Sequence, residues 1–295
     1  AEMSESHGYV HADCGGRPRS AVCYFDRPSH TGTENVMMAA SLADGPTTIL
    51  NAATDPEIAD FARFLTAMGA RIKGAGGPVV TVEGVKSLRG ADHIPIGDRL
   101  EAGTYLYGAI LTRGKVTVRG IDPEHLAVPL LKMREMGAKI ETAPDEIALE
   151  MRDRPRAVNY TTAVYPGFPT DLQPAAMVAL TLAEGTGFVR ETIFENRFLH
   201  VMELLRLGAN IVINGDRASV TGVDHLDGAE VMASDIRAGA ALILSGLAAR
   251  GTTEVLRVYH VDRGYENIAG KLSSLGADIT RIDQFEWSKK KKAGA

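Results

Sequence analysis

The sequence predicts an α/β fold assembled from copies of one repeated unit, and two observations support this prediction. A Gly-Ala pair closes a segment four times, at intervals of 68, 71 and 68 residues, with its glycine at Gly69, Gly137, Gly208 and Gly276. A turn glycine also precedes a β-branched segment in each copy, at Gly45, Gly114, Gly185 and Gly251. A fixed period of this length indicates a repeat architecture. Strand-like segments that alternate with helix-like ones indicate the α/β class.

Each copy begins with an apolar helix, which we expect over 33–43, 102–112, 172–183 and 236–249. Alanine and methionine dominate these segments and few charges interrupt them. A helix that is apolar around its whole circumference is normally buried. We therefore expect these four helices to lie inside the fold.

A short β-branched strand follows each apolar helix, over 47–51, 115–119, 188–191 and 252–256. An amphipathic helix comes next, over 56–68, 123–136, 198–207 and 265–275. Pro56 and Pro123 stand in the first turn, where proline is tolerated. The Gly-Ala pair then ends the helix in the way that a C′ glycine does.

One more strand follows in each copy, beginning at Arg71, Lys139, Asn210 and Asp278, and three copies have a further strand at 79–83, 147–151 and 218–221. The unit is therefore of βαβαββ type. Residues 8–26 resemble the last strands of an earlier unit, and the fourth unit ends at Asp283 without its final strand. Unpaired sheet edges at both ends favour the presence of further chain before Ala1.

The composition excludes several classes of protein. A chain that is 45% hydrophobic and 23% charged is globular, and a net charge of −5 gives no general attraction to nucleic acid or anionic lipid. No apolar run is long enough to span a membrane. Two cysteines make no disulfide framework, which favours a cytoplasmic setting, and the scattered histidines predict no metal site. The KKKK run near the C-terminus is most simply a solvated tail.

Polar residues and arginines gather at the predicted starts of the apolar helices. These starts are Ser29-His30-Thr31, Asp98-Arg99, Thr170-Asp171 and Ser234-Asp235, and arginines stand nearby at Arg27, Arg99, Arg197, Arg237 and Arg263. Helix N-termini and arginines together suit a ligand with several negative charges. The alternative is that Ser, Thr and Asp only cap their helices. The arginines and the additional acid Asp171 favour the ligand site.

The sequence resembles the enolpyruvyl transferase family, and within it the branch of UDP-N-acetylglucosamine 1-carboxyvinyltransferases. The resemblance covers residues 8–283. Its most specific strings are RPSHTGTEN (27–35), NAATDPEIAD (51–60), DRLEAGT (98–104), YPGFPTDLQ (165–173), ETIFENRFLH (191–200), MASDIRA (232–238) and YHVDRGYE (259–266). EPSP synthases, which act on shikimate 3-phosphate, share the repeat fold of this family but not these strings.

The resemblance implies an α/β prism, or inside-out barrel, of two domains with three units each. Four of the six units would be present: 1–97 would be a remnant of the first domain, 98–283 the second domain, and 284–295 a basic tail. The family's Lys-Asn pair and its loop with a catalytic cysteine have no counterpart in the sequence. We therefore expect the N-terminal third to be missing, and no measurable enolpyruvyl transfer by these 295 residues alone.

The activity implied by the resemblance is transfer of the enolpyruvyl group from phosphoenolpyruvate to the 3-hydroxyl of UDP-N-acetylglucosamine, with release of phosphate. This is the first committed step of peptidoglycan precursor synthesis, and it requires no cofactor. By the same resemblance, Asp171 would accept the hydroxyl proton and Asp235 would take a proton from the methyl group during elimination. Arg263, Arg237 and Arg197 would bind phosphoenolpyruvate.

For the nucleotide sugar, the resemblance implies contacts from Arg27, Ser29, His30 and Thr31 to the uridine diphosphate. It also implies a backbone contact from Ile193. The family usually has lysine at the position of Arg27 and Val-Gly at the positions of His30 and Thr31. The charge is therefore kept at the first position, and the contacts at the other two would be made by the backbone.

Two further interpretations stay open. The chain could be a paralogue that binds a UDP-sugar without catalysis, or another enzyme of the same repeat fold, either a different enolpyruvyl transferase or a cyclase. Cys14 in CGGRP superficially matches the family's cysteine loop, but its arginine follows too closely, so we expect an ordinary thiol there. The sequence does not indicate an oligomeric state.

Overall fold

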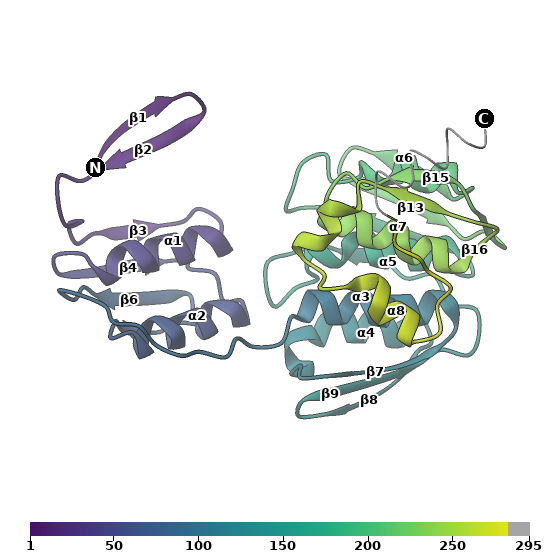
Figure 1. Ribbon diagram of the computed structural model, residues 1–295, viewed down its shortest axis with the longest axis horizontal. Coiled ribbons are helices and arrows are strands. Elements are labelled where there is room, and N and C mark those ends of the chain that lie inside the picture. The colour runs from purple at the N-terminus through teal and green to yellow at the C-terminus, as the bar shows by residue number, and fades with distance from the viewer. Residues whose placement is uncertain (283–295) are drawn as a thin grey trace. The chain divides into compact units, whose positions relative to one another are not determined.

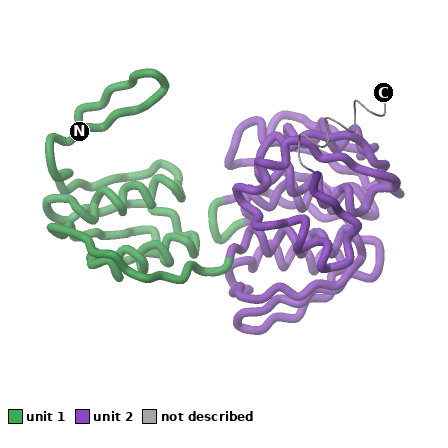
Figure 2. Tube along the Cα trace, viewed as in Figure 1, with its two compact units in different colours: residues 1–97, 164–167 green, residues 98–163, 168–295 purple. Residues whose placement is uncertain are grey.

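The computed structural model of the protein describes residues 1–282, in two compact units. The first unit comprises residues 1–97 and 164–167, and the second comprises 98–163 and the rest of the described chain (Figure 2). The predicted basic tail at 284–295 lies outside the described residues. No helix within 1–282 is both long and apolar enough to cross a membrane.

The first unit contains one four-stranded sheet and a separate hairpin. Its elements are β1 (Glu2–Ser6), β2 (Tyr9–Asp13), β3 (Val22–Tyr24), α1 (His30–Ser41), β4 (Pro46–Leu50), α2 (Pro56–Ala67), β5 (Arg71–Lys73) and β6 (Val79–Glu83). The sheet order is β3-β4-β6-β5; β3 runs parallel to β4, and the other two pairs are antiparallel. From β3 to β6 the chain follows the predicted βαβαββ order.

The second unit repeats this plan around three central helices. Its elements before residue 200 are α3 (Arg99–Thr112), β7 (Lys115–Arg119), the 3₁₀ turn η1 (Pro123–Leu126), α4 (Ala127–Glu135), β8 (Lys139–Ala143), β9 (Glu146–Glu150), β10 (Tyr160–Thr161), the 3₁₀ turn η2 (Thr170–Leu172), α5 (Gln173–Thr181) and β11 (Thr186–Arg190). The later elements are α6 (His200–Arg206), β12 (Asn210–Asn214), β13 (Arg217–Thr221), β14 (Leu226–Asp227), β15 (Glu230–Met232), α7 (Ile236–Ala248), β16 (Ala249–Arg250), β17 (Glu254–Leu256), the 3₁₀ turn η3 (Val258–Arg263) and α8 (Ile268–Ser274).

Helices α3, α5 and α7 pack against one another in the middle of this unit, and the sheets lie outside them (Figure 1). All nine residues of α5 are buried, as the apolar composition of the segment predicts. The sheet β10-β11-β13-β12 has the same order and directions as the sheet of the first unit. A three-stranded sheet, β7-β9-β8, carries α3 and α4 on one face.

Four predictions about the elements are corrected by the structure. Helix α1 buries only four of its twelve residues, because within its unit it packs on one sheet and α2 rather than among other central helices. Residues 22–24 belong to the sheet of the first unit instead of an earlier unit, although β1 and β2 do form an antiparallel hairpin. The strand expected from Asp278 is absent from residues 278–282. In the turn after α3, Arg113 (φ 54°) adopts the left-handed conformation in place of Gly114.

Candidate functional site

A cavity of about 470 Å³ lies in the second unit, at the starts of η2, α7 and the segment before α6. Eleven residues line it: Asp171, Glu195, Asn196, Arg197, Leu199, Ser234, Asp235, Ile236, Arg237, His260 and Arg263. Three of these are arginines that come from three different elements. The cavity therefore brings together three positively charged residues that are far apart in the sequence.

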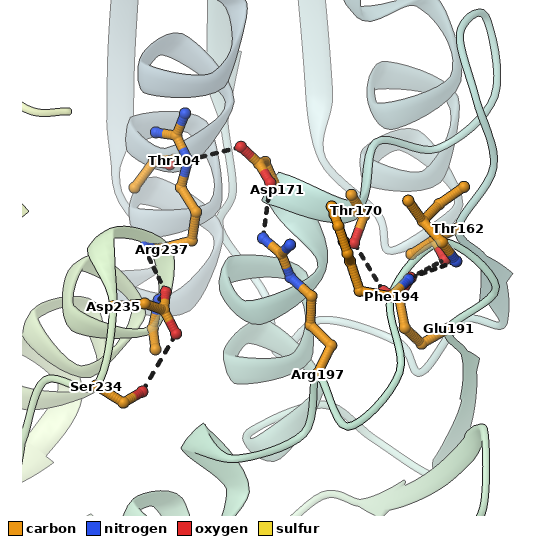
Figure 3. Close-up of polar contacts among 12 residues, drawn as sticks. Thr104, Thr162, Thr170, Asp171, Glu191, Phe194, Arg197, Ser234, Asp235 and Arg237 are labelled. Atoms are coloured by element: carbon orange, nitrogen blue, oxygen red, sulfur yellow. Dashed lines mark hydrogen bonds and ion pairs between the residues drawn. The ribbon is translucent and has the colours of Figure 1, made fainter. Parts of the chain in front are cut away.

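Asp171 occupies the 3₁₀ turn that leads into α5, and its carboxylate bonds to two arginines. Arg197 Nη2 donates to Oδ1 at 2.6 Å, and Arg237 Nε donates to Oδ2 at 3.1 Å (Figure 3). The turn makes no side-chain capping bond, so Asp171 is not the helix cap that the alternative interpretation of its sequence proposed. Each guanidinium fork retains further N–H groups for a ligand.

Arg237 is fixed by an aromatic ring as well as by Asp171. Its guanidinium carbon lies 5.3 Å from the centre of the Tyr265 ring, and the Tyr265 hydroxyl is 2.8 Å from Thr104 Oγ1. Burial disfavours the charge, but Tyr265 and Asp171 outweigh it and raise the pKa of Arg237 above its ordinary value. Arg237 therefore stays cationic in a largely buried position.

Asp235 is the N-cap of α7. Its Oδ1 accepts from the backbone N–H groups of Arg237 at 2.9 Å and Ala238 at 2.8 Å. Its Oδ2 accepts from the Ser234 hydroxyl at 3.2 Å (Figure 3). Capping uses one oxygen, so the other keeps lone pairs that are available at the cavity wall.

Arg197 and Arg263 differ in how firmly they are held. Arg197 lies over the Phe194 ring, with 4.9 Å between the guanidinium carbon and the ring centre, and it follows Asn196, whose φ is 55°. Arg263 ends η3, is exposed, and forms no hydrogen bond or ion pair within the described chain. Ile193 is half-buried and donates its backbone N–H to Glu191 at 2.8 Å.

The other predicted contacts to the nucleotide lie in the first unit, around the start of α1. Ser29 caps α1 by accepting from Gly32 N at 3.1 Å, and His30 lies 3.8 Å from Glu34 and 3.9 Å from Glu57. Arg27 and Thr31 are exposed. The structure thus places these residues together at one helix start, apart in the sequence from the arginine cavity.

Residues 1–272 match the family described as EPSP synthase (3-phosphoshikimate 1-carboxyvinyltransferase). The chain belongs to the enolpyruvyl transferase family.

One curated relative is 52% identical over 283 residues, which are 96% of this chain and 67% of the relative. It is the UDP-N-acetylglucosamine 1-carboxyvinyltransferase of Anaeromyxobacter dehalogenans (strain 2CP-C). This relative is a transferase, so the chain belongs to a family of enzymes.

Two solved structures have the fold of this enolpyruvyl transferase chain. The enolpyruvyl transferase NikO from Streptomyces tendae matches with a TM-score of 0.83 at 24% identity, over 95% of this chain and 69% of its own. The EPSP synthase from Acinetobacter baumannii matches with a TM-score of 0.66 at 16% identity, over 90% of this chain and 64% of its own. At these identities the likeness shows the fold alone. The predicted repeat-built α/β architecture is confirmed.

Two buried polar residues of this enolpyruvyl transferase were missed by the sequence analysis. Glu191 is 3% exposed and accepts four hydrogen bonds just after β11. His200 is 2% exposed at the start of α6, next to the cavity residue Leu199. Both lie in the string ETIFENRFLH, where a charged residue directly after a strand was the available indication.

A group of potential metal ligands also exists within residues 1–282. His30, Asp55 and Glu57 place ligand atoms within 4.8 Å of one another in the first unit. His30 also lies 3.8 Å from Glu34, outside this group. Both cysteines are free thiols, and Cys14 is exposed.

Proposed function

We propose that this enolpyruvyl transferase acts on phosphoenolpyruvate and UDP-N-acetylglucosamine, and that the cavity around Asp171 holds the reacting groups. The observation that carries the proposal is Asp171 between Arg197 and Arg237, in a cavity that Arg263 also lines. The name of the relative with 52% identity supports the choice of acceptor.

Phosphoenolpyruvate carries a carboxylate and a phosphate, and the cavity supplies three guanidinium groups to match them. Planar forks bind such oxygens in pairs, more strongly than a point charge does. Arg263 has no partner within the described residues, and the fork of Arg237 has further N–H groups beyond the one that Asp171 accepts. Cations that are fixed before the reaction stabilise the charge that develops in it.

Asp171 is proposed as the base for the addition step. The oxygen of the sugar 3-hydroxyl forms a bond to C2 of the enolpyruvyl group and loses its proton to the carboxylate, while the C2–C3 double bond opens and C3 takes a proton from water to become a methyl group. General base catalysis of this kind contributes about 10²- to 10⁴-fold to a rate. The two arginines hold the Asp171 carboxylate in one orientation. A general base needs such a fixed orientation to accept the proton of one particular hydroxyl.

Asp235 is proposed for the elimination step. The bond between C2 and the phosphate oxygen breaks, phosphate leaves, and a methyl proton is removed so that the double bond forms again. Capping of α7 engages Oδ1, whereas among the described residues Oδ2 has only the Ser234 hydroxyl as partner, so Oδ2 is the atom that would take this proton.

The nucleotide part of the acceptor is proposed to use Arg27, Ser29, His30 and Thr31 of the first unit, together with the backbone of Ile193. The reaction would serve peptidoglycan precursor synthesis in the cytoplasm, a reducing setting that two free cysteines fit. Shikimate 3-phosphate, the acceptor implied by the description of the matched family, is the competing candidate.

Binding and phosphate release together test the proposal. Calorimetry should detect phosphoenolpyruvate binding that Arg263→Gln weakens about tenfold, the effect of losing one charge-assisted contact. UDP-N-acetylglucosamine should bind the chain weakly, and shikimate 3-phosphate should not bind. Phosphate release is assayed with each acceptor; none is expected from these 295 residues alone, and the relative from Anaeromyxobacter dehalogenans, of which the chain spans 67%, serves as the positive control. Phosphate release with shikimate 3-phosphate but not with UDP-N-acetylglucosamine would contradict the proposed acceptor. Binding of the UDP-sugar without binding of phosphoenolpyruvate would favour the non-catalytic paralogue.

A further inference from the structure

Glu191 is a buried carboxylate whose bonds all come from neutral donors. Its Oε1 accepts from Thr162 Oγ1 at 2.8 Å, from Ile193 N at 2.8 Å and from Phe194 N at 3.2 Å. Its Oε2 accepts from Thr170 Oγ1 at 2.9 Å. A charged group at 3% exposure needs such a complete set of donors, because an unsatisfied buried charge is costly.

The four donors belong to three segments that are separate in the sequence. Thr162 follows β10, Thr170 opens η2, and the two amides belong to the segment between β11 and α6 (Figure 3). Thr162 strengthens this junction, since its Oγ1 accepts from Thr192 N at 2.9 Å and its carbonyl accepts from Thr192 Oγ1 at 2.6 Å. One carboxylate therefore joins the η2 turn to the segment that leads into α6.

Each of these two joined segments carries one member of the ion pair at the cavity. Asp171 directly follows Thr170, and Arg197 comes three residues after Phe194. Arg197 Nη2 and Asp171 Oδ1 are 2.6 Å apart, so a small shift of either segment would break the bond. Arg237 reaches the same carboxylate from α7, and none of the four hydrogen bonds that Glu191 accepts within the described chain comes from that helix.

We propose that Glu191 is a positioning residue that sets the distance between Asp171 and Arg197, and this inference rests on the proposed function of the Asp171 cavity. Glu191 lies behind the pair and does not line the cavity. The hydroxyl and amide donors that bind Glu191 are neutral, so they hold the two segments in place without competing with Asp171 for the guanidinium of Arg197. That guanidinium therefore remains directed at Asp171 and at a bound anion.

The test compares Glu191→Gln with a matched control. The amide keeps the shape of the side chain but offers only one acceptor oxygen, so the hydroxyl and amide donors can no longer all be satisfied. The control is Asp60→Asn in the first unit, where another buried carboxylate accepts from Arg63 and Ile96 and also bonds to His93. Glu191→Asp is the conservative variant, too short to reach both threonines.

The first readout needs no substrate: hindered rotation of the two guanidinium groups, observed by ¹⁵N NMR of arginine side chains. Glu191→Gln should release Arg197 and leave Arg237 restrained, whereas Asp60→Asn should change neither. A purely structural role for Glu191 would leave Arg197 restrained or release both arginines together, and either result would overturn the proposal.

The second readout is phosphoenolpyruvate affinity in a double-mutant cycle. Glu191→Gln should weaken binding about tenfold, and should add little in an Arg197→Gln background, because residues in one network are not additive. Its effect should remain in full in an Arg237→Gln background. Additive effects with Arg197→Gln would refute the positioning role. If the unaltered chain binds no phosphoenolpyruvate, the proposed function fails while the NMR readout still decides the role of Glu191.

Discussion

Arg154 makes in the second unit the same three main-chain hydrogen bonds that Arg17 makes in the first. Arg154 donates from Nε to Leu182 O and from Nη2 to Ala183 O and Val223 O, at 3.1, 3.3 and 2.9 Å. The same atoms of Arg17 donate to Leu42 O, Ala43 O and Val85 O, at 3.0, 2.7 and 2.7 Å. In both places a guanidinium therefore satisfies the carbonyls just after the first helix of a repeat, α1 or α5, and ties them to a residue just after its last strand, β6 or β13.

Arg154→Ala should lower the free energy of unfolding of the second unit by about 2 kcal/mol, since it leaves carbonyls at the end of α5 without a cationic donor. Arg154→Lys should recover only part of the loss because lysine lacks the planar fork. Urea denaturation followed by circular dichroism measures both. Arg152→Ala is the control, because Arg152 is 78% exposed and pairs only with Glu150 among the described residues. Equal losses for Arg152→Ala and Arg154→Ala would contradict the role of the main-chain bonds.

Asp171→Asn should separate anion binding from catalysis. In the structure the carboxylate already occupies N–H groups of Arg197 and Arg237 that an incoming anion would also use. Neutralising it should therefore tighten phosphoenolpyruvate binding by about threefold or more while lowering turnover by about 10²-fold. Calorimetry and phosphate release are the measurements, with the same change made in the relative from Anaeromyxobacter dehalogenans for the turnover arm. Normal turnover in a well-folded variant would exclude Asp171 as the base.

Arg263→Lys should affect the small anion and spare the nucleotide sugar. The charge remains, but the fork that could hold two oxygens at once is lost, so phosphoenolpyruvate affinity should fall about threefold, less than for Arg263→Gln. Affinity for UDP-N-acetylglucosamine should stay nearly unchanged. Arg250→Lys is the control. Arg250 is exposed and lies in β16, just after the C-terminal end of α7, whereas the cavity is at the N-terminal end of that helix. An equal loss for both ligands would argue that Arg263 serves the general structure.

His200 should make the second unit less stable in mild acid. Burial is the main cause that lowers the pKa of His200 to about 4, against an ordinary value near 6.5; Asp235 opposes the shift and Arg197 adds to it. The unfolded chain takes up this proton first, so the contribution is complete above pH 6.5 and is lost as the pH falls towards 4. The loss approaches about 3 kcal/mol. Urea denaturation at pH 7.5 and 4.5 should show a smaller pH difference for His200→Gln than for the unaltered chain, and an equal difference would be the contrary result.

Local backbone requirements were the part of the fold that the sequence predicted best. All four closing glycines have positive φ, between 87° and 109°, as the end of a helix requires. Helices α6 and α8 were predicted to begin two and three residues too early, at Phe198 and Tyr265. The residues at those starts serve the site or the core instead, and periodicity does not distinguish these roles.

The candidate site was predicted unevenly for the same reason. Composition and spacing singled out Asp171 and the nearby arginines for an anionic ligand, while only the family resemblance gave Asp171, Arg197 and Arg237 their separate roles. The structure adds that Asp171 bonds to both arginines. The position of Glu191 directly after a strand was the one indication of its role, because Thr162 and Thr170, which bind its carboxylate, are 29 and 21 residues away in the sequence.

The bond between Asp171 and Arg237 joins two repeats, because Asp171 precedes α5 and Arg237 opens α7. Neither repeat alone possesses the anion cavity, so during refolding the cavity comes into existence only when these two helices have docked. If the cavity binds phosphoenolpyruvate as proposed, the anion would report the rate of that docking event. An anion that binds only the docked pair must also slow its separation, and ligand in the medium would act on this protein as a clamp between neighbouring repeats.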